Sequence, residues 1–329
     1  MLYRCVAQGE RGIINKSKVG TRASRLAIAQ TQISLEALRK TNPFIDFEVV
    51  TISTKGDIDK RPFFALDEKG IFEKEINEAV IEGKVDFAVH SLKDIPSDLS
   101  DKLTIACIPK RAKPNDVLVN EKKIKLRDLP SGSVIGTSSL RRAIQLIRKR
   151  RDLNVKPIRG NVETRVKKSI KGEYDSIILA EAGLTRLGMR DLIVERFSTR
   201  DFMPSPGQGA IAIVCRKDDL RLIKILRSIE DQRSRTEIAA ERSLLRKIDA
   251  GCRFPVGVYA VANYDASRVV LRANAFSADG TRSLKIMVTG SGKEANKLGI
   301  RGANVLFRDG VMELAEGWRH AVEEWNKKL

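Results

Sequence analysis

The segment SVIGTSSLRRAIQL, residues 133–146, says most about how this chain folds. An apolar lead-in is followed by Gly-Thr-Ser-Ser, and apolar residues then recur at helical spacing, which predicts a strand that turns tightly into a helix. The first N–H groups of such a helix lack internal partners and lie at the positive end of its dipole. With hydroxyl groups, Arg141 and Arg142 beside them, they predict an anion-binding site. The alternative is a capped helix on a basic surface.

A similar device occurs near the start of the chain, in KVGTRASRLAIAQ, residues 18–30. Gly83 and Gly172 each end a predicted helix and lead into an apolar strand. Each half of the chain therefore alternates strands and helices, which predicts a mainly parallel sheet covered on both faces. Two such α/β domains would place two helix starts at a shared cleft, where open α/β sheets bind ligands.

Composition restricts the class of protein. The chain has 329 residues and 42% hydrophobic residues, enough for two or three globular domains. No segment approaches the ~20 apolar residues of a membrane span, so we expect no membrane contact and a cytoplasmic protein. The net charge of +19 raises nucleic acid as a partner, but basic and acidic residues alternate and aromatic residues are only 5%. A small, carboxylate-rich ligand is at least as plausible.

Two segments rich in proline, at residues 109–115 and 203–209, suggest that the chain crosses twice between the domains. The predicted first domain is 18–112 with a returning segment, 207–230, and the second is 113–206. Residues 231–329 form a small α+β domain, and residues 1–17 an extension. In the third domain we expect a helix over 233–247, strands near 256–262, 269–276 and 284–289, and a final helix over 311–325.

The four cysteines stand at 5, 107, 215 and 252, and the two histidines at 90 and 320. Their spacing matches no metal-ligand pattern, so no metal is expected. Cys252 lies in a predicted loop beside Arg253, where a cation can lower the thiol pKa. From these residues alone, an inert loop cysteine and a reactive one both remain open.

Two further segments combine chemistry-bearing residues. HSLKDIP, residues 90–96, follows a predicted strand and offers an imidazole, an ammonium and a carboxylate, which suit proton transfer or the stabilisation of a cation. The alternative is a solvated turn. RGNVETR, residues 159–165, places two arginines around a predicted helix start, where guanidinium groups bind carboxylates in a bidentate manner.

Eight segments together resemble the hydroxymethylbilane synthase family, also called porphobilinogen deaminases. They follow the family's order over residues 18–262 and are GTRASRLAIAQ, KGIFEKEI, DFAVHSLKDIP, GTSSLRRAIQL, RGNVETR, YDSIILAEAGLTRLG, PSPGQGAIAI and AGCRFPVG. The resemblance implies two periplasmic-binding-protein-like α/β domains around a cleft and a small α+β third domain. It implies an enzyme that joins four porphobilinogen molecules head to tail, releases ammonia at each step and frees hydroxymethylbilane by hydrolysis.

The resemblance also implies roles for single residues. Asp94 would be the catalytic carboxylate, because it would stabilise the cationic species left when ammonia departs. Cys252 would carry a dipyrromethane cofactor through a thioether. The cofactor would be bound by Lys93, Ser139, Arg141, Arg142, Ser91 and Thr137. Substrate and growing chain would be bound by Arg22, Ser24, Arg159, Arg165, Gln208 and Lys69.

Two residues depart from the family pattern. Arg25 stands where many members have proline, and Glu163 occupies a variable position. The expected partner is porphobilinogen, with no nucleic acid, and the expected state is a monomer. The competing interpretations are a solute-binding protein with the same two-lobed fold and no chemistry, and a nucleic-acid binder.

Overall fold

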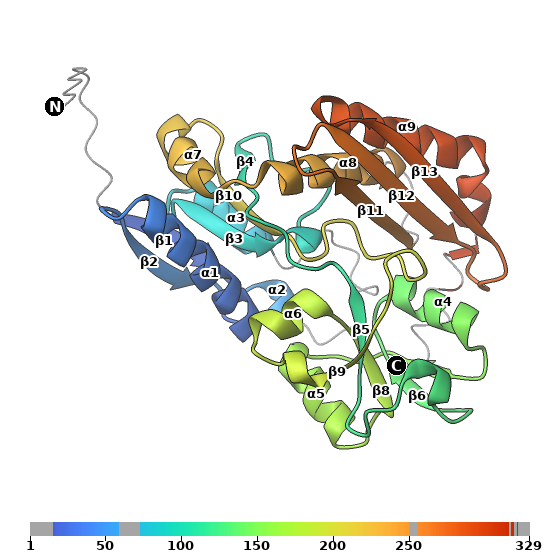
Figure 1. The fold of residues 1–329 in the computed structure, drawn as a ribbon. Helices are drawn as coiled ribbons and strands as arrows, with labels where there is room; N and C mark the ends of the chain where they lie inside the picture. Colours follow the sequence, from blue (N-terminus) through green and yellow to red (C-terminus); the bar gives the residue numbers. More distant parts are fainter. Residues whose placement is uncertain (1–15, 59–72, 250–254, 316, 319–320, 322–329) are drawn as a thin grey trace, which may run out of the picture.

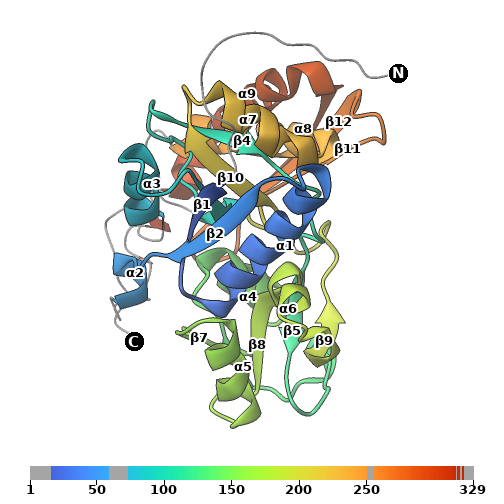
Figure 2. The same ribbon diagram turned by 90° about the vertical axis from the view of Figure 1, so that its left-hand side faces the viewer.

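The computed structural model describes residues 16–58, 73–249, 255–315, 317–318 and 321. These residues form two five-stranded sheets and one three-stranded sheet (Figure 1). The predicted architecture, two α/β domains and a small α+β domain, is confirmed by these three sheets and the helices that pack on them. Figure 2 shows the elements of the first sheet above those of the second, with α1 and α6 close to their junction.

The first sheet has the strand order β2-β1-β3-β10-β4. Its strands are β1 (Lys16–Thr21), β2 (Asp46–Thr51), β3 (Phe87–Ser91), β4 (Leu103–Cys107) and β10 (Ile211–Arg216). Its helices are α1 (Arg25–Thr41), α2 (Lys55–Ile58), α3 (Lys74–Ile81) and α7 (Leu220–Leu226). β1 pairs in parallel with β2 and β3, whereas β10 is antiparallel to β3 and β4.

The second sheet repeats this plan in the order β7-β6-β8-β5-β9. Its strands are β5 (Asp116–Val119), β6 (Val134–Gly136), β7 (Asn154–Lys156), β8 (Ser176–Ala180) and β9 (Ile193–Arg196). Its helices are α4 (Leu140–Lys149), α5 (Val162–Ile170) and α6 (Glu181–Arg186). Again one strand, β5, is antiparallel to both of its neighbours.

The prediction of mainly parallel sheets is therefore confirmed except at β5 and β10. Both strands follow a crossing between the domains, so each enters its sheet from the end at which the parallel strands finish. The two crossings lie side by side, since the Ala112 N–H donates to the Gly209 carbonyl at 3.2 Å. The two sheets are thus joined by paired extended segments.

Both faces of each five-stranded sheet are covered, as predicted. Val19, Phe87 and Val89 pack on one face of the first sheet in one apolar cluster, while Ala88 and Ile76 belong to a cluster on the other face. The second sheet also has two clusters, one containing Ile135 and the other Ile177. Because side chains alternate along a strand, two separate clusters require strands that are apolar on both sides.

Serine side chains begin the two helices that the sequence singles out. Ser24 accepts a hydrogen bond from the Ala27 N–H at 3.3 Å, and Ser139 accepts one from the Arg142 N–H at 3.4 Å. Each cap satisfies one N–H group that the helix itself leaves without a partner. The predicted helix exits are confirmed as well, because Gly83 and Gly172 have φ of 72° and 76°.

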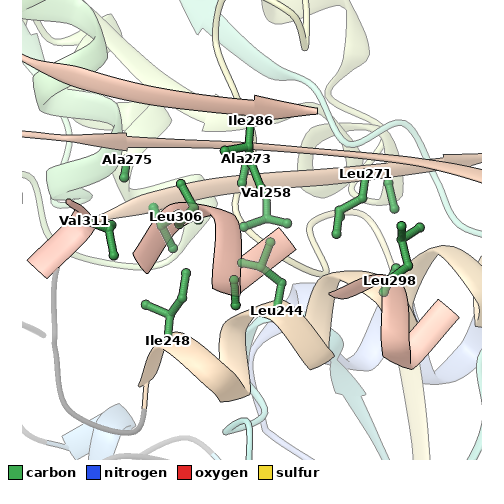
Figure 3. Close-up of a cluster of buried hydrophobic side chains, with 14 of the residues drawn as sticks. Leu244, Ile248, Val258, Leu271, Ala273, Ala275, Ile286, Leu298, Leu306 and Val311 are labelled. Atoms are coloured by element: carbon green, nitrogen blue, oxygen red, sulfur yellow. The ribbon is translucent and has the colours of Figure 1, made fainter. Parts of the chain in front are cut away.

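The third domain is a three-stranded sheet with two helices on one face (Figure 3). Its elements are α8 (Gln232–Asp249), β11 (Val256–Ala262), β12 (Arg268–Phe276), β13 (Ser283–Ser291) and α9 (Ala295–Arg308). Leu244, Val258, Leu271 and Leu306 are fully buried between helices and sheet. Residues 311–315 are helical, as predicted, but α9 is an element that the sequence analysis missed.

Candidate active site

A cavity of about 690 Å³ lies between the first two domains. It opens where β3 and β8 end and where the capped helices α1 and α5 begin. Nine predicted site residues line it together: Arg22, Ser24, Ser91, Lys93, Asp94, Arg142, Arg159, Arg165 and Gln208. The structure therefore brings residues separated by almost 190 positions to one cleft, as expected for ligand sites at the strand ends of α/β sheets.

Positive charge dominates this cavity. Its described lining holds six cationic side chains, Arg22, Lys93, Arg142, Arg159, Arg165 and Arg186. Among the same lining residues, Asp94 has the single carboxylate side chain. Such a site favours a ligand that carries several carboxylate groups, because each ion pair formed away from bulk water also relieves repulsion between the cations.

The arginines of the cavity repel one another. The Arg165 pKa is lowered to about 10 by burial and by the charges of Arg142 and Arg159. Arg165 Nε donates to the Gly160 carbonyl at 2.8 Å, so the guanidinium is held at the start of α5. An anionic ligand would reduce the repulsion between the arginines, and the Arg165 guanidinium would then bind that ligand more firmly.

Asp94 ends a short 3-10 turn, Leu92–Asp94, directly after β3. Lys93 and Asp94 are both accessible to the cavity. Asp94 raises the Lys93 pKa, but burial and the guanidinium groups of Arg142 and Arg165 lower it further, so the net shift is downward. The ammonium of Lys93 therefore also gains from an incoming carboxylate.

Most of the segment GTSSLRR, residues 136–142, lies outside the lining of the cavity, where we expected its side chains. Thr137, Ser139 and Arg141 are not among the residues that line the cavity. The Ser139 N–H donates to Thr137 Oγ1 at 3.2 Å, so these hydroxyls shape the turn itself. The Arg141 side chain is 5% exposed and donates to the Asp116 carboxylate at 2.8 Å. Arg142 alone of the motif's two arginines reaches the cavity.

Asp116, which the sequence analysis missed, connects these residues to the crossing segments. Its fully buried carboxylate accepts hydrogen bonds from Arg141 Nη1, Arg142 Nε and Gln208 Nε2 at 2.8, 2.9 and 3.0 Å. Burial raises the Asp116 pKa, but the two arginines and Gln208 lower it more, so the carboxyl stays ionised. No local motif marks Asp116, because its partners lie at least 25 residues away in the sequence.

Two more lining residues carry signals that the sequence analysis did not use. Arg186 donates to the Gly209 carbonyl at 2.6 Å, and burial lowers its pKa to about 10. Gln30 is hydrogen bonded to Ser91 at 2.8 Å. Both residues lie within segments that carry the family resemblance, GLTRLG and LAIAQ. Their place in these segments could have marked them as candidate site residues.

Two predicted site residues, Cys252 and Lys69, lie outside the described residues. Within the described part, no group of three or more His, Cys, Asp or Glu side chains is arranged to hold a metal ion. No helix among those residues is long and apolar enough to cross a membrane.

His90 does not contribute an imidazole to the cavity lining described here, contrary to the interpretation of the HSLKDIP segment. The side chain is 6% exposed, and its pKa is lowered to about 4 by burial and then by Arg22. A buried neutral imidazole of this kind cannot supply a proton at neutral pH. His90 is therefore a buried residue of β3, the strand that positions Asp94.

We expect His90 to make the protein sensitive to acid. The unfolded chain binds this proton near pH 6.5 and the folded chain near pH 4, so stability is full above about pH 6.5 and falls as the pH drops toward 4. Between pH 7 and pH 5 the loss from this group is about 2 kcal/mol. Urea unfolding of wild type and His90→Gln at both pH values checks this, and equal pH dependence in the two proteins would contradict it.

The two departures from the family pattern meet across the cleft. Arg25 Nη1, on α1 of the first domain, lies 3.2 Å from Glu163 Oε1, on α5 of the second. The Arg25 side chain is 73% exposed and that of Glu163 is 11% exposed. The pair connects the two domains near the cleft and places a compensating cation beside a carboxylate of the helix that begins between Arg159 and Arg165.

We expect a small, salt-sensitive coupling between Arg25 and Glu163. Exposed pairs contribute about 0.2–1 kcal/mol, and salt screens them. A double-mutant cycle with Arg25→Gln and Glu163→Gln, read by urea unfolding, should show this coupling at low salt and lose it at high salt. A cycle that gives zero coupling at low salt would show that the pair contributes nothing between the domains.

Two family models match most of the chain. A family model described as "Porphobilinogen deaminase, dipyromethane cofactor binding domain" matches residues 17–224. A second, "Porphobilinogen deaminase, C-terminal domain", matches residues 235–308. Among solved structures, the methionine-binding protein MetQ has a TM-score of 0.42 and 15% identity, covering 66% of this chain and 90% of its own.

Sequence relatives cover nearly the whole chain. A probable porphobilinogen deaminase of Nitrosopumilus maritimus is 53% identical over 309 residues, which are 94% of this chain and 98% of the relative. A porphobilinogen deaminase of Geobacillus sp. is 41% identical over 317 residues, 96% of this chain and 100% of the relative. The chain therefore belongs to the porphobilinogen deaminase family.

Proposed function

We propose that this cleft joins four porphobilinogen molecules head to tail on a dipyrromethane cofactor held by Cys252, releases an ammonia at each step and frees hydroxymethylbilane by hydrolysis. The observation that carries the proposal is the cavity itself, in which six cationic side chains surround the carboxylate of Asp94. Porphobilinogen and its oligomers bear acetate and propionate groups on every ring. A cationic cleft is the complement of such a chain.

The described residues fit the cofactor's chemistry. Its carboxylates need cations that gain from a further negative charge. Asp94 raises the Lys93 pKa, but burial and the neighbouring arginines lower it more, and burial and neighbouring arginines also lower the Arg165 pKa. When bound, the cofactor supplies the pyrrole carbon to which the first substrate unit is joined. Lys93 and Arg142 are placed to bind its carboxylates, and the hydroxyl of Ser91, which also lines the cavity, can donate a further hydrogen bond.

Asp94 is the residue suited to the chemical step. When the protonated amino group of porphobilinogen leaves as ammonia, it takes the electrons of its carbon–nitrogen bond with it, and the pyrrole with its remaining methylene carbon becomes cationic. The Asp94 carboxylate stabilises this charge through the pyrrole N–H. Because the other charged groups of the described lining are cations, they bind carboxylates at the edges and leave the ring to Asp94.

The remaining lining residues act by positioning. Arg22 and Ser24 at the start of α1 face Arg159 and Arg165 around the start of α5 across the cavity. Guanidinium groups in this arrangement bind carboxylates in a bidentate manner and fix their orientation. Holding both reactants in one geometry lowers the entropic part of the barrier. We include Gln208, because it lines the cavity and is bonded to Asp116.

We also propose that the protein is a cytoplasmic monomer with domains at 18–112 plus 207–230, 113–206 and 231–329. The described residues of one chain are enough to line the cavity, so the proposed site does not require a second copy. A reducing compartment suits the two free, buried thiols of Cys107 and Cys215. Size-exclusion chromatography with light scattering tests the oligomeric state, and a stable dimer would contradict this part of the proposal.

Cys252→Ser is expected to yield folded protein without a covalent adduct and without turnover. A hydroxyl is a much weaker nucleophile than a thiolate, so no stable thioether equivalent forms. Intact-mass measurement of wild type and variant, each after incubation with porphobilinogen, reads the adduct directly. Cys107→Ser is the matched control, because Cys107 is buried in the first domain's core. An adduct retained in Cys252→Ser would move the attachment site elsewhere.

A further inference from the structure

Arg242 of α8, in the third domain, binds the backbone that directly follows Asp94. Its Nη1 donates to the Ile95 carbonyl at 3.3 Å, and its Nη2 donates to the carbonyls of Pro96 and Ser97 at 2.8 and 3.1 Å. One guanidinium group thus binds three consecutive carbonyls of another domain. Figure 1 shows α8 between β4 and the β11–β13 sheet, where it can make this connection.

The other side of the Asp94 turn is also fixed. The Leu92 N–H donates to the Ala210 carbonyl at 3.1 Å, which ties the turn to the crossing segment. Gly207 packs so closely on this turn that a Cβ there would lie 2.3 Å from a Leu92 methyl carbon, and its φ is +73°. Asp94 is therefore held between the crossing segment before it and Arg242 after it.

Arg242 is buried although its side chain is charged. The residue is 8% exposed, and burial lowers its pKa to about 10, with the charge of Arg246 acting in the same direction. The hydrogen bonds described for its guanidinium end on neutral carbonyls. A planar group with fixed donor directions holds several carbonyls in one geometry, which a flexible lysine ammonium does less well.

Arg246, one turn further along α8, provides a comparison. It reaches toward the same loop, where its Nε lies 3.6 Å from Asp98, but its side chain is 59% exposed and that of Asp98 is 80% exposed. Such a pair contributes little to stability or geometry. The chain therefore offers two arginines on one helix, of which only Arg242 is buried against the backbone next to Asp94.

We propose that Arg242 is a positioning residue, which fixes the backbone of residues 95–97 and thereby the place of the Asp94 carboxylate in the cleft. This inference rests on the proposed role of Asp94. A displacement of a reacting group by about 1 Å can lower a rate by about 100-fold. Loss of Arg242 should therefore act on the chemical step and leave the carboxylate-binding arginines in place.

The test compares kcat and KM for Arg242→Gln and Arg242→Lys, both confirmed by mass to carry the cofactor. We expect kcat to fall about 10- to 100-fold in Arg242→Gln, with KM within about two-fold of wild type. Arg242→Lys should recover part of the loss, because an ammonium can still donate to one or two of the carbonyls. This order of kcat, with lysine between arginine and glutamine, is what a positioning role predicts.

Two controls separate positioning from general destabilisation. Arg246→Gln should keep the kcat of wild type. Leu298→Ala, near the start of α9, opens a cavity in the third-domain core and should lower the melting temperature while leaving kcat unchanged. A cofactor-loaded Arg242→Gln or Arg242→Lys protein with the kcat of wild type would overturn the inference, and so would an equal loss of kcat in Leu298→Ala.

Asp94→Asn distinguishes this inference from the proposed function. If Asp94→Asn turns over normally, the role of Asp94 fails, and the inference fails with it. If Asp94→Asn is inactive while loaded Arg242→Gln is normal, only the inference about Arg242 fails.

Discussion

Asp94→Asn should lower turnover of porphobilinogen by about 100- to 1,000-fold, the usual effect of removing one group that stabilises transition-state charge. The amide occupies the same volume as the carboxylate but carries no charge, so the cationic pyrrole left by ammonia release loses its counter-ion. The variant should still carry its adduct, because the described cationic groups that bind carboxylates are unchanged. Ammonia release and tetrapyrrole formation, followed in parallel, measure the effect.

Asp98→Asn is the matched control for this prediction. Asp98 lies four residues further along the same loop, but its side chain is 80% exposed and is 3.6 Å from Arg246. Its amide should turn over at the rate of wild type. Near-normal turnover in Asp94→Asn, or an equal loss in both variants, would contradict the role assigned to Asp94.

Asp116→Asn should destabilise the protein by about 3–5 kcal/mol, the cost of removing one partner from a buried ionic group. Asp116 is 0% exposed, and it compensates the charges of Arg141 and Arg142, which are 5% and 6% exposed. Its amide would leave two buried guanidinium groups without a counter-ion at the junction of the domains. Urea unfolding at pH 7 gives the size of the loss.

The loss at Asp116 should be specific to the buried network. Asp116→Asn combined with Arg141→Gln removes one uncompensated cation and should recover part of the stability. Asp128→Asn is the control, because Asp128 pairs with Arg127 at an exposed site of the same domain. Because the Asp116 pKa is lowered, its contribution is present above the unfolded pKa of about 4 and is lost as the pH falls through the folded value. A loss below about 1 kcal/mol would show that the two arginines find other partners.

Local patterns in the sequence predicted the parts of the site that local chemistry builds. Helix starts at Ser24 and Ser139, the strand end before Asp94 and the arginines around α5 are all marked by residues within a few positions of one another. Nine of the site residues predicted from the sequence line one cavity. The role of Asp94 stays a prediction, since the geometry places it but does not measure it.

What the sequence could not show depends on distant partners. Arg141 and Arg142 are adjacent and were given one role, yet one donates to the Met203 carbonyl in the interior and the other lines the cavity. Helical periodicity puts neighbours about 100° apart, but only the packing of the second sheet shows which of them faces the cleft. Asp116 was missed because its partners come from α4 and from the second crossing.

α9 was missed for a similar reason. Its sequence includes Gly299 and Gly302, which weaken the helical signal because glycine has a low helix propensity. In the fold these glycines permit close packing, since a Cβ at Gly299 would lie 2.4 Å from the Ala240 carbonyl oxygen of α8. Gly299 therefore permits contact between two helices, although the local sequence around it predicts a break in the helix.

The intact mass of the wild-type protein, measured before and after a limited addition of porphobilinogen, tests the proposed function directly. We expect a protein that already carries a dipyrromethane adduct and then shows a series of species, each heavier by one substrate unit less ammonia, with tetrapyrrole released into solution. A protein with the mass of the bare polypeptide, unchanged by porphobilinogen and without tetrapyrrole, would contradict the proposed function.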